Sequence, residues 1–511
     1  MSNKNNFEKI SQDKFEFVQR DGMIHDKKLE TKARGFFADA FLRFRKNKSS
    51  VVAAWILLFL VVFAILAPII SPYDVNTKDE MFVNNPAFFR PVAELGWGIL
   101  DGSHERVSQT EASMLSWRAI AEETGYDPLI SITGETIEKI KYRGGYIDRS
   151  TYTIETNAYY EVGIVYRTFS YADFQKLMDW QNETGIQVIY PWVDAKDING
   201  LTNSPNVWYE VDKKGAPVLN AEGNFTPVYC TNASIEGMPY TSIRVAGDDG
   251  SYIYSSAVSG AVRARVCYYN YYQYVHGNEP MYLFGTNAIG QDLFCAVGKG
   301  AQFSILFAIC VSIINLSIGM VYGAVQGYYG GWVDMVLDRI CDVLSGVPFV
   351  VVATLFQLHL AQKVGVVPSF LFAFVLTGWI GMSALTRKQF YRFKSQEFVM
   401  AARTLGASDW RLMFKHIFPN GLGTIITSCA LVIPNVIYSE TNMTYLGIVD
   451  LNSLVGTTLG ALLSAGQASL VAAPHALLWP SIYLALLMIS FNLFGNGLRD
   501  AFNPSTRGAE D

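Results

Sequence analysis

The sequence is short of charge. Only 17% of its 511 residues are charged and 50% are hydrophobic, whereas soluble domains usually carry about 25% charged residues. The deficit is uneven, so several segments are almost free of charge. The composition therefore excludes a chain that is soluble throughout, and the net charge of −5 points to no particular partner.

Motifs for covalent chemistry are also missing. The chain has no GxxxxGK[ST] phosphate-binding loop, no HExxH and no GxSxG. Its six cysteines form no CxxC pair and show no metal-ligand spacing. We therefore expect no enzymatic activity, no bound metal, no cofactor of its own and no nucleic-acid partner.

Long apolar stretches are what the sequence does have. A helix needs about 20 apolar residues to cross a bilayer, because its backbone polar groups must be satisfied within the helix. Six uncharged stretches approach or reach that length: Val51–Ile70, Phe303–Tyr322, Val343–Leu360, Ser369–Leu385, Gly421–Tyr438 and Ala476–Phe494. A soluble core does not supply so many such runs, so the sequence predicts six membrane spans.

Basic residues set the expected orientation. They cluster from Lys27 to Lys48 and again from Arg387 to Lys415, and such clusters favour the cytoplasmic side. With six spans, both clusters and both termini fall in the cytoplasm. The expected order is a cytoplasmic segment (1–48), a first span (49–71), an extracellular domain (72–282), a five-helix core (283–500) with a cytoplasmic loop (387–419), and a cytoplasmic tail (501–511).

The region 72–282 is large enough to have its own core. Alternating runs at Tyr152–Thr156 and Tyr160–Tyr166 predict strands, and the spacing in Tyr171–Trp180 predicts a helix. We therefore expect an inserted α+β domain. The tyrosine-rich run Tyr268–Tyr272 fits either a partner-binding surface or, as we prefer, strand core plus a belt at the membrane interface.

Two cysteines, Cys230 and Cys267, lie in this polar region. They are able to pair if the region faces an oxidising compartment, and the sequence leaves that pairing open.

The most informative stretch is Glu397-Phe-Val-Met-Ala-Ala-Arg-Thr-Leu-Gly406 and the residues that follow it, up to Asn420. Glu397–Leu405 favours a helix that Gly406 can end in a left-handed conformation. Ser408 is suited to cap a second helix, which we expect to run to Phe418, with the next span starting at Pro419. The small residues of this corner let another protein approach closely, which indicates a docking element.

This stretch resembles the signature of the permease subunits of ABC importers, in the form found in the peptide and nickel subfamily. The positions that carry the resemblance are Ala401, Ala402, Gly406 and Pro419, with Glu397, Ser408 and His416–Asn420 fitting the subfamily. In that family the corner docks on an ATPase subunit. The resemblance therefore implies that the ATPase-coupling residues are Glu397, Ala401, Ala402, Arg403, Gly406, Ala407, Ser408 and Pro419.

One position departs from the signature. Met400 stands where the family has glutamate. A charged anchor is therefore missing there, and Arg403 and Glu397 are the candidates to compensate for it.

Further stretches resemble the same subfamily: Gly285–Phe294, Gly327–Asp334, Ser439–Gly447 and Asn492–Asp500. Outside residues 73–281 the chain is similar to the C-type member of the oligopeptide and dipeptide permease pair. The large external insertion departs from the compact form of that subunit. We expect the insertion to dock or orient a substrate-binding lipoprotein, or to seal the outer entrance.

The resemblance implies an α-helical polytopic protein of the bacterial cytoplasmic membrane, with a type I importer permease fold. It also implies a second permease subunit, two cytoplasmic ATPase subunits that use the ATP, and an extracellular substrate-binding lipoprotein. The expected function is to form half of the translocation pathway for oligopeptides or dipeptides. The alternatives are an importer of nickel or another small solute, a secondary transporter, and a membrane scaffold.

Polar residues in or beside the predicted spans are candidates for function, because burying charge in lipid is unfavourable. Glu440 is the candidate pathway residue. The group Asp334, Asp338, Arg339 and Asp342 is better interpreted as a network that holds helix ends than as a substrate site. Gln302, Asn315 and Gln326 fit either a pore lining or packing between helices.

Overall fold

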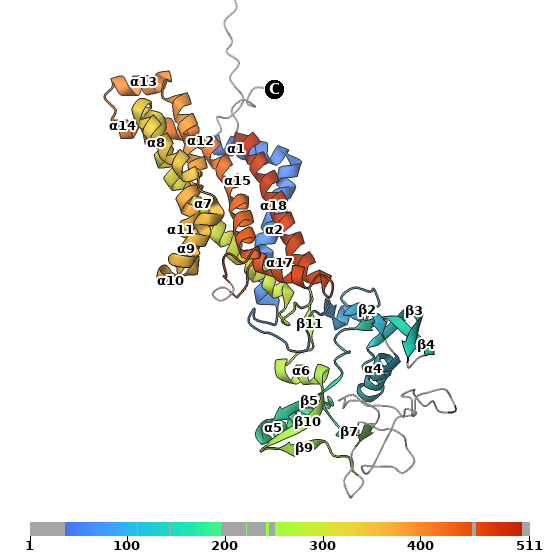
Figure 1. Cartoon of the computed structure of the whole chain (residues 1–511). Coiled ribbons are helices and arrows are strands. Elements are labelled where there is room, and N and C mark those ends of the chain that lie inside the picture. The colour runs from blue at the N-terminus through green and yellow to red at the C-terminus, as the bar shows by residue number, and fades with distance from the viewer. Residues whose placement is uncertain are drawn as a thin grey trace, which may run out of the picture.

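The computed structural model of the chain describes residues 36–109, 111–142, 145–195, 221, 242–244, 251–451 and 456–502. These residues form a helical bundle with an α+β domain at one of its ends (Figure 1). The opposite end of the bundle carries α1 and the corner between α13 and α14. The domain is inserted between α2 and α7, as the sequence predicts.

Among the described residues, five helical segments are long and apolar enough to cross a membrane. They are α2 (Lys48–Ile70), α7 (Leu293–Tyr329), the pair α11 (Val366–Gly378) and α12 (Ile380–Phe393), the continuous segment Asp409–Tyr445 that ends in α15 (Phe418–Tyr445), and α18 (Pro474–Phe502). Each contains one of the predicted spans. The bundle also contains α1 (Phe36–Lys46), α10 (Ala361–Val364) and α17 (Leu459–Ala468).

The predicted third span, Val343–Leu360, is not one straight helix. The chain there forms α8 (Gly331–Ser345) and α9 (Phe349–His359), which meet at a bend of 73°. Pro348 lies at the bend and precedes α9. A proline disfavours helical geometry in the residue before it, so the helix stops at this point. The described spans number six only if this bent pair is counted as one.

Glycines bring α7 and α12 into close contact. Gly319, Gly323 and Gly327 lie one turn apart on α7, and each faces the backbone of α12. A Cβ atom added at Gly323 would lie 2.3 Å from the carbonyl oxygen of Ser383. Small residues at this spacing let two membrane helices approach closely and pack tightly.

We call the inserted domain the external domain, after the orientation that the sequence predicts. It contains several small antiparallel sheets. One has the order β2-β4-β3 and another the order β5-β10-β6, with β9 also paired to β10. Two short pairs, β1 with β11 and β7 with β8, complete them. The strand bounds are Phe88–Phe89, Ser103–Gln109, Leu129–Tyr142, Gly145–Asn157, Ile164–Phe169, Ile189–Tyr190, Val193–Ala195, Ser242–Arg244, Ser255–Val258, Ala261–Cys267 and Met281–Tyr282, for β1 to β11 in order.

Four helices accompany these strands: α3 (Arg90–Ala93), α4 (Glu111–Thr124), α5 (Tyr171–Thr184) and α6 (Tyr268–His276). The helix predicted at Tyr171–Trp180 is α5, and the strand predicted at Tyr152–Thr156 lies in β4. The strand predicted at Tyr160–Tyr166 starts later, at Ile164, because a turn precedes it.

The tyrosine-rich run is helical, so the strand that we expected there is wrong. Tyr268, Tyr269 and Tyr272 are buried on α6 in a cluster with Phe82 and Tyr159. Tyrosines at positions 268, 269 and 272 share one helical face, since residues three and four apart lie side by side. The run therefore forms core rather than a partner-binding surface.

The domain is attached to the bundle through the segment Gly285–Phe294, which resembles the subfamily. Asp292 caps α7 by accepting from the amides of Phe294 and Cys295, and it also accepts from Ser71 Oγ at 2.7 Å. Burial raises the pKa of Asp292 to about 6, despite these hydrogen bonds. Gly290 packs so closely on Asp79 that an added Cβ would lie 1.8 Å from its carbonyl oxygen.

A cluster around Glu161 ties β2 to the turn after β4. Burial by itself raises the pKa of Glu161, but hydrogen bonds from His104, Arg106 and Thr156 outweigh it and lower the pKa to about 2. The side chain of Glu161 is only 9% exposed, and Arg106 Nη2 lies 2.6 Å from its Oε2. A carboxylate held in this way stabilises the folded domain only while it is ionised.

We predict that Glu161→Gln destabilises the domain at neutral pH and that the effect fades in acid. The folded-state pKa lies below the ordinary value of 4.5. The stabilisation is therefore complete above that value and is lost as the pH falls toward 2. Because Arg106 is half exposed, we expect about 2 kcal/mol rather than the full linkage value.

Hydrogen exchange of the β4 amides in the detergent-purified chain, compared at pH 7 and pH 3, measures this difference. Glu135→Gln, which changes an exposed carboxylate on β3, is the matched control. A deficit in Glu161→Gln that is equally large at both pH values would contradict the linkage.

Candidate functional site

The candidate site is the corner between α13 (Glu397–Thr404) and α14 (Asp409–Arg411), at the end of the bundle opposite the external domain (Figure 1). The corner has the geometry that the sequence predicts. Gly406 has a φ of +82°, and its N–H donates to the carbonyl of Arg403 while the N–H of Ala407 donates to that of Ala402. This pattern ends a helix in a left-handed residue, a conformation that favours glycine.

The second half of the corner differs from the expectation. Ser408 precedes α14 in extended conformation, but its side chain makes no capping hydrogen bond. The helix does not stop at Phe418 either. It passes through a π-helical segment, Leu412–Ile417, into α15, so that Asp409–Tyr445 is one continuous helix.

Pro419 is the second residue of α15, which begins where that π-helical segment ends. Proline has no N–H to donate, and its ring crowds the carbonyl one turn earlier. Widening the preceding turn to π geometry accommodates the ring without ending the helix. The sequence therefore predicts the position of the irregularity correctly, but it predicts the end of a helix where the structure has a π-helical segment within a continuous helix.

One tyrosine holds the corner against the bundle. Tyr328, near the end of α7, donates from Oη to Asp409 Oδ1 at 2.5 Å and accepts from Arg403 Nη2 at 3.2 Å. The guanidinium of Arg403 also lies over the Tyr328 ring, 5.7 Å from its centroid. Both helices of the corner are thus bound to the same residue of α7.

A small apolar cluster supports these contacts. Its buried members come from α7, α12, α13 and the π-helical segment: Ala324, Tyr328, Phe390, Val399, Leu412, Met413 and Ile417. Ala402 and Ala407 are half-buried against it. We expected four small residues on the surface: Ala401, Ala402, Gly406 and Ala407. Two of them, Ala402 and Ala407, face inward, and the other two are exposed.

Large apolar side chains take the exposed positions instead. Leu405 is 88% exposed and Trp410 is 61% exposed. Leu405 directly precedes the left-handed Gly406, and Trp410 lies in α14, just after the corner. Sequence reasoning missed these two residues. Two large apolar residues, Leu405 and Trp410, in a loop rich in basic residues were a signal that could have identified them.

Met400 is half exposed on the same helix as Glu397, one turn further on. Arg403 is engaged by Tyr328, so it holds the corner in place. Glu397 is exposed in the first turn of α13. A role for either residue in compensating for the missing glutamate stays a prediction.

The acidic residues after α7 fall into two groups. Arg387 of α12 binds both Asp334 and Asp338 of α8, at 2.5 and 2.8 Å, and Tyr391 donates to Asp334 at 2.7 Å. Arg339 and Asp342 instead pair with each other on the exposed side of α8. The first group ties α8 to α12, as expected of a network that holds helix ends.

Three polar residues pack between helices. Gln302 donates to the carbonyl of Ala64 at 2.7 Å, and Asn315 donates to that of Phe374 at 3.5 Å. Gln326 donates to Asp338 at 3.2 Å. Of the two interpretations left open by the sequence, the structure favours packing.

Glu440 is completely buried between α15 and α7. Its Oε2 accepts from Ser304 Oγ at 2.7 Å, while Oε1 has no hydrogen-bond partner among the described residues. A buried carboxylate with one unsatisfied oxygen is uncommon. Its role in the pathway stays a prediction.

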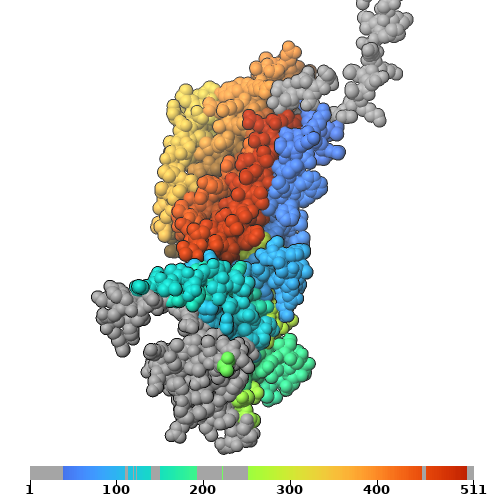
Figure 2. All heavy atoms as spheres, turned by 90° about the vertical axis from the view of Figure 1, so that its right-hand side faces the viewer, coloured from blue at the N-terminus to red at the C-terminus, as the bar shows by residue number. Residues whose placement is uncertain are grey.

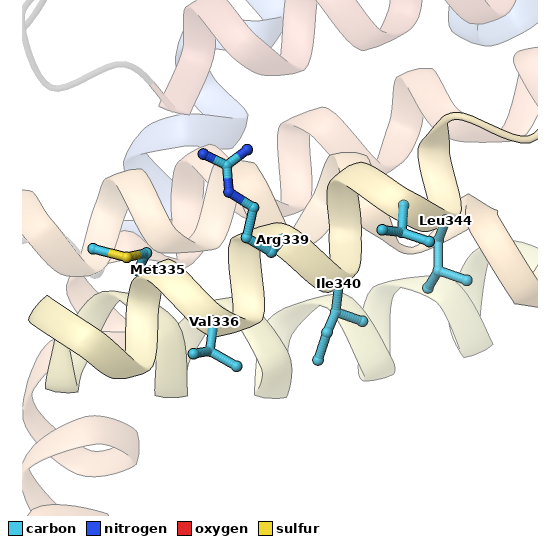
Figure 3. A pocket seen from close by; sticks show the side chains of 6 residues that line it. Met335, Val336, Arg339, Ile340 and Leu344 are labelled. Carbon is cyan, nitrogen blue, oxygen red and sulfur yellow. The ribbon is translucent and has the colours of Figure 1, made fainter.

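A shallow groove of about 480 Å³ runs along α8 (Figure 3). Six residues of that one helix line it: Met335, Val336, Arg339, Ile340, Val343 and Leu344. Because α8 belongs to the bent candidate span, exposed apolar side chains there match a lipid environment. We assign no ligand to this groove.

Cys267 is buried at the start of α6. Cys230 lies outside the described residues, so the pairing of the two stays a prediction.

Comparisons with known proteins match both flanks of the external domain. Residues 315–508 match the family described as binding-protein-dependent transport system inner membrane component. Residues 35–87 match the N-terminal TM domain of oligopeptide transport permease C.

Among curated relatives, the oligopeptide transport system permease protein OppC of Bacillus subtilis (strain 168) is 35% identical over 224 residues, which cover 44% of this chain and 72% of the relative. The dipeptide transport system permease protein DppC of Lactococcus lactis subsp. cremoris (strain MG1363) is 38% identical over 234 residues, or 46% and 66% of the two chains.

One solved structure with some likeness shows inward facing conformations of the MetNI methionine ABC transporter. The match covers 41% of this chain and 96% of that chain at 11% identity, with a TM-score of 0.35. A score this low carries no structural argument.

We predict that Tyr328→Phe loosens the corner and leaves the spans intact. The substitution removes the hydroxyl that binds Asp409 and Arg403, so we expect α13 and α14 to lose about 1 kcal/mol of local stability. Amide hydrogen exchange in α13 and α14 should then speed up by roughly fivefold, because local opening limits that exchange.

Tyr329→Phe is the matched control. Tyr329 is next to Tyr328 in the chain, but its side chain is 52% exposed and lies outside the buried cluster. Equal exchange in both variants would show that the Tyr328 hydroxyl does not hold the corner.

Proposed function

The chain belongs to the family of binding-protein-dependent transport system inner membrane components, and on that premise we propose that it is one of two permease subunits of an ATP-driven importer of oligopeptides or dipeptides. The names of the relatives support the substrate class. Nickel import has no observation in its favour.

The observation that carries the proposal is the exposed corner at Gly406. Leu405 and Trp410 project from it. Burial of apolar surface favours association, and tryptophan is among the residues that contribute most to binding energy at protein interfaces. We propose that this corner inserts into a groove of a cytoplasmic ATPase subunit. Two such subunits would use the ATP, one against this chain and one against a second permease.

The anchoring of the corner supports a transmission role. Tyr328 connects both of its helices to α7, and the apolar cluster connects them to α12. A push on the corner would therefore move α7 and α12 as one body rather than bend a loose loop. We propose that ATP-driven closure of the ATPases switches the spans between inward-facing and outward-facing arrangements in this way.

The orientation follows from the same assignment. The corner and α1 lie at one end of the bundle and the external domain lies at the other (Figure 1). If ATPases bind the corner, that end and both termini are cytoplasmic, and the domain lies outside the bacterial cell membrane. The basic residues of the loop agree with this orientation.

We propose that the external domain docks a substrate-binding lipoprotein. The turn after α3 exposes Leu95, Trp97 and Ile99, at 55%, 69% and 57%. Gly96 and Gly98 adopt positive φ values of 68° and 65°, which keep this short segment projecting. Exposed aromatic and aliphatic side chains on a rigid turn are suited to anchor a partner.

We predict that Leu405→Asp abolishes co-purification of the ATPase from mild detergent. A charge placed in an apolar interface is strongly unfavourable, and Leu405 contacts little else in the chain because it is 88% exposed. Folding should therefore be unaffected. Ser395→Asp, at an exposed position before α13, is the matched control. If no ATPase accompanies the wild-type chain in several detergents, the importer assignment fails.

We also predict that the double variant Leu95→Ser, Trp97→Ser lowers peptide uptake at limiting lipoprotein concentration by at least about tenfold, as loss of an interface anchor implies. Uptake by reconstituted importer is the measurement, and ATPase co-purification should be unchanged. Ile137→Ser changes an exposed apolar residue on β3, 64% exposed, and serves as the control. Uptake equal to wild type at every lipoprotein concentration would remove the docking role.

A further inference from the structure

A polar pocket of about 370 Å³ lies between the external domain and the bundle. Three separate segments line it: Val83–Asn85 near the start of the domain, His104–Val107 with Gln109 on β2, and Val471–Ala472 between α17 and α18. In Figure 2 the region of the domain around β2–β4, in cyan, lies directly below the end of the bundle, in red. The pocket is therefore at the outer end of the spans.

The lining of the pocket shows that it follows the edge of a strand. Side chains alternate between the two faces of a sheet, so a pocket on one face touches every second residue. This pocket touches four consecutive residues of β2, from His104 to Val107. Among the described residues the sheet order is β2-β4-β3, so no described strand pairs with the other edge of β2.

The hydrogen bonds of β4 establish which main-chain groups face that edge. The N–H of Asn157 donates to Pro128, on the β3 side, and the N–H of Ala158 donates to Gly102, on the β2 side. Alternation then directs Thr156 toward β2, where it pairs with His104. Its neighbour Glu105 must direct its own N–H and C=O the other way, toward the pocket.

We propose that an extended peptide binds in this pocket by pairing its main chain with Glu105 at the free edge of β2. The inference rests on the proposed function, because it takes the transported peptide as the occupant. A peptide added to a sheet edge is held by main-chain hydrogen bonds. Such a site accepts many sequences and would hold a peptide beside the outer ends of the spans.

The surroundings fit a main-chain site. His104 and Arg106 are both bound to Glu161, so both side chains are already engaged. Amide side chains from Asn84 and Gln109 and apolar ones from Val107 and Val471 complete the lining. Val107 is 62% exposed and Val471 is 100% exposed, so both are open to contact with side chains of any peptide.

The same strand limits the length of the pairing. Its register with β4 shifts between Arg106 and Gln109, and Ser108 has a φ of +57°. A bulge of this kind ends regular pairing. The available edge is thus short, which suits a small peptide and explains why the strand does not offer a long template for aggregation.

The test is direct binding of a fluorescein-labelled hexapeptide rich in valine and threonine to the purified full-length chain, followed by fluorescence anisotropy. Glu105→Pro removes the N–H that faces the pocket, and proline is tolerated on a sheet edge. We expect binding roughly fivefold weaker, as loss of one hydrogen bond implies. Glu105→Ala keeps the N–H and is the matched control, with little change expected.

A second probe does not depend on the folding of a variant. The same hexapeptide with N-methyl groups on its central residues cannot donate from those positions, so it should bind the wild-type chain at least about fivefold more weakly. Equal binding of both peptides, or equal losses in Glu105→Pro and Glu105→Ala, would overturn the proposal.

Two outcomes separate this site from neighbouring hypotheses. If Glu105→Pro leaves peptide binding unchanged but prevents association of the lipoprotein, the edge belongs to that partner and the proposal is wrong. Peptide uptake by the wild-type importer tests the proposed function independently. Uptake that persists while both binding probes fail would overturn the site and leave the permease assignment standing.

Discussion

The close contact between α7 and α12 is the constraint on which the rest of the molecule depends. Three glycines remove side chains from the interface, and the backbones of the two helices touch. Next to this interface, Arg387 of α12 forms ion pairs with Asp334 and Asp338 of α8. These ion pairs attach α8 to the pair α7 and α12. Since α12 leads directly into α13, the position of the exposed corner is fixed by this contact.

The helix α7 also joins the two functional ends. Its 37 residues span roughly 55 Å at 1.5 Å per residue, more than the hydrocarbon thickness of a bilayer. Asp292 and Ser71 hold its first turn at the external domain, and Tyr328 holds the corner near its last turn. Movement of the corner would therefore reach the external domain along one continuous helix, without a hinge inside it.

Much of the fold and of the corner was predictable from the sequence, and each failed prediction has an identifiable structural cause. Absence of charge located the five continuous spans and the apolar bent pair, and Gly406 located the corner, because both signals are contained in short stretches of sequence. The bend before α9 and the π-helical turn before Pro419 came from single prolines whose effect depends on neighbouring packing. Ala402 packs against a cluster that includes Tyr328 of α7, whereas Leu405 stays exposed; this packing joins segments that are far apart in the chain.

The insertion can be accommodated because its two ends meet. Tyr73 and Tyr282, at its start and finish, stack with ring centroids 4.6 Å apart, and β1 pairs with β11 beside them. A domain whose termini lie together can be added to a loop without moving the helices on either side. This geometry explains how the flanks keep the family resemblance while the segment between them departs from it. It also requires the domain to follow α2 and α7, which makes it a fixed part of the outer end of the spans.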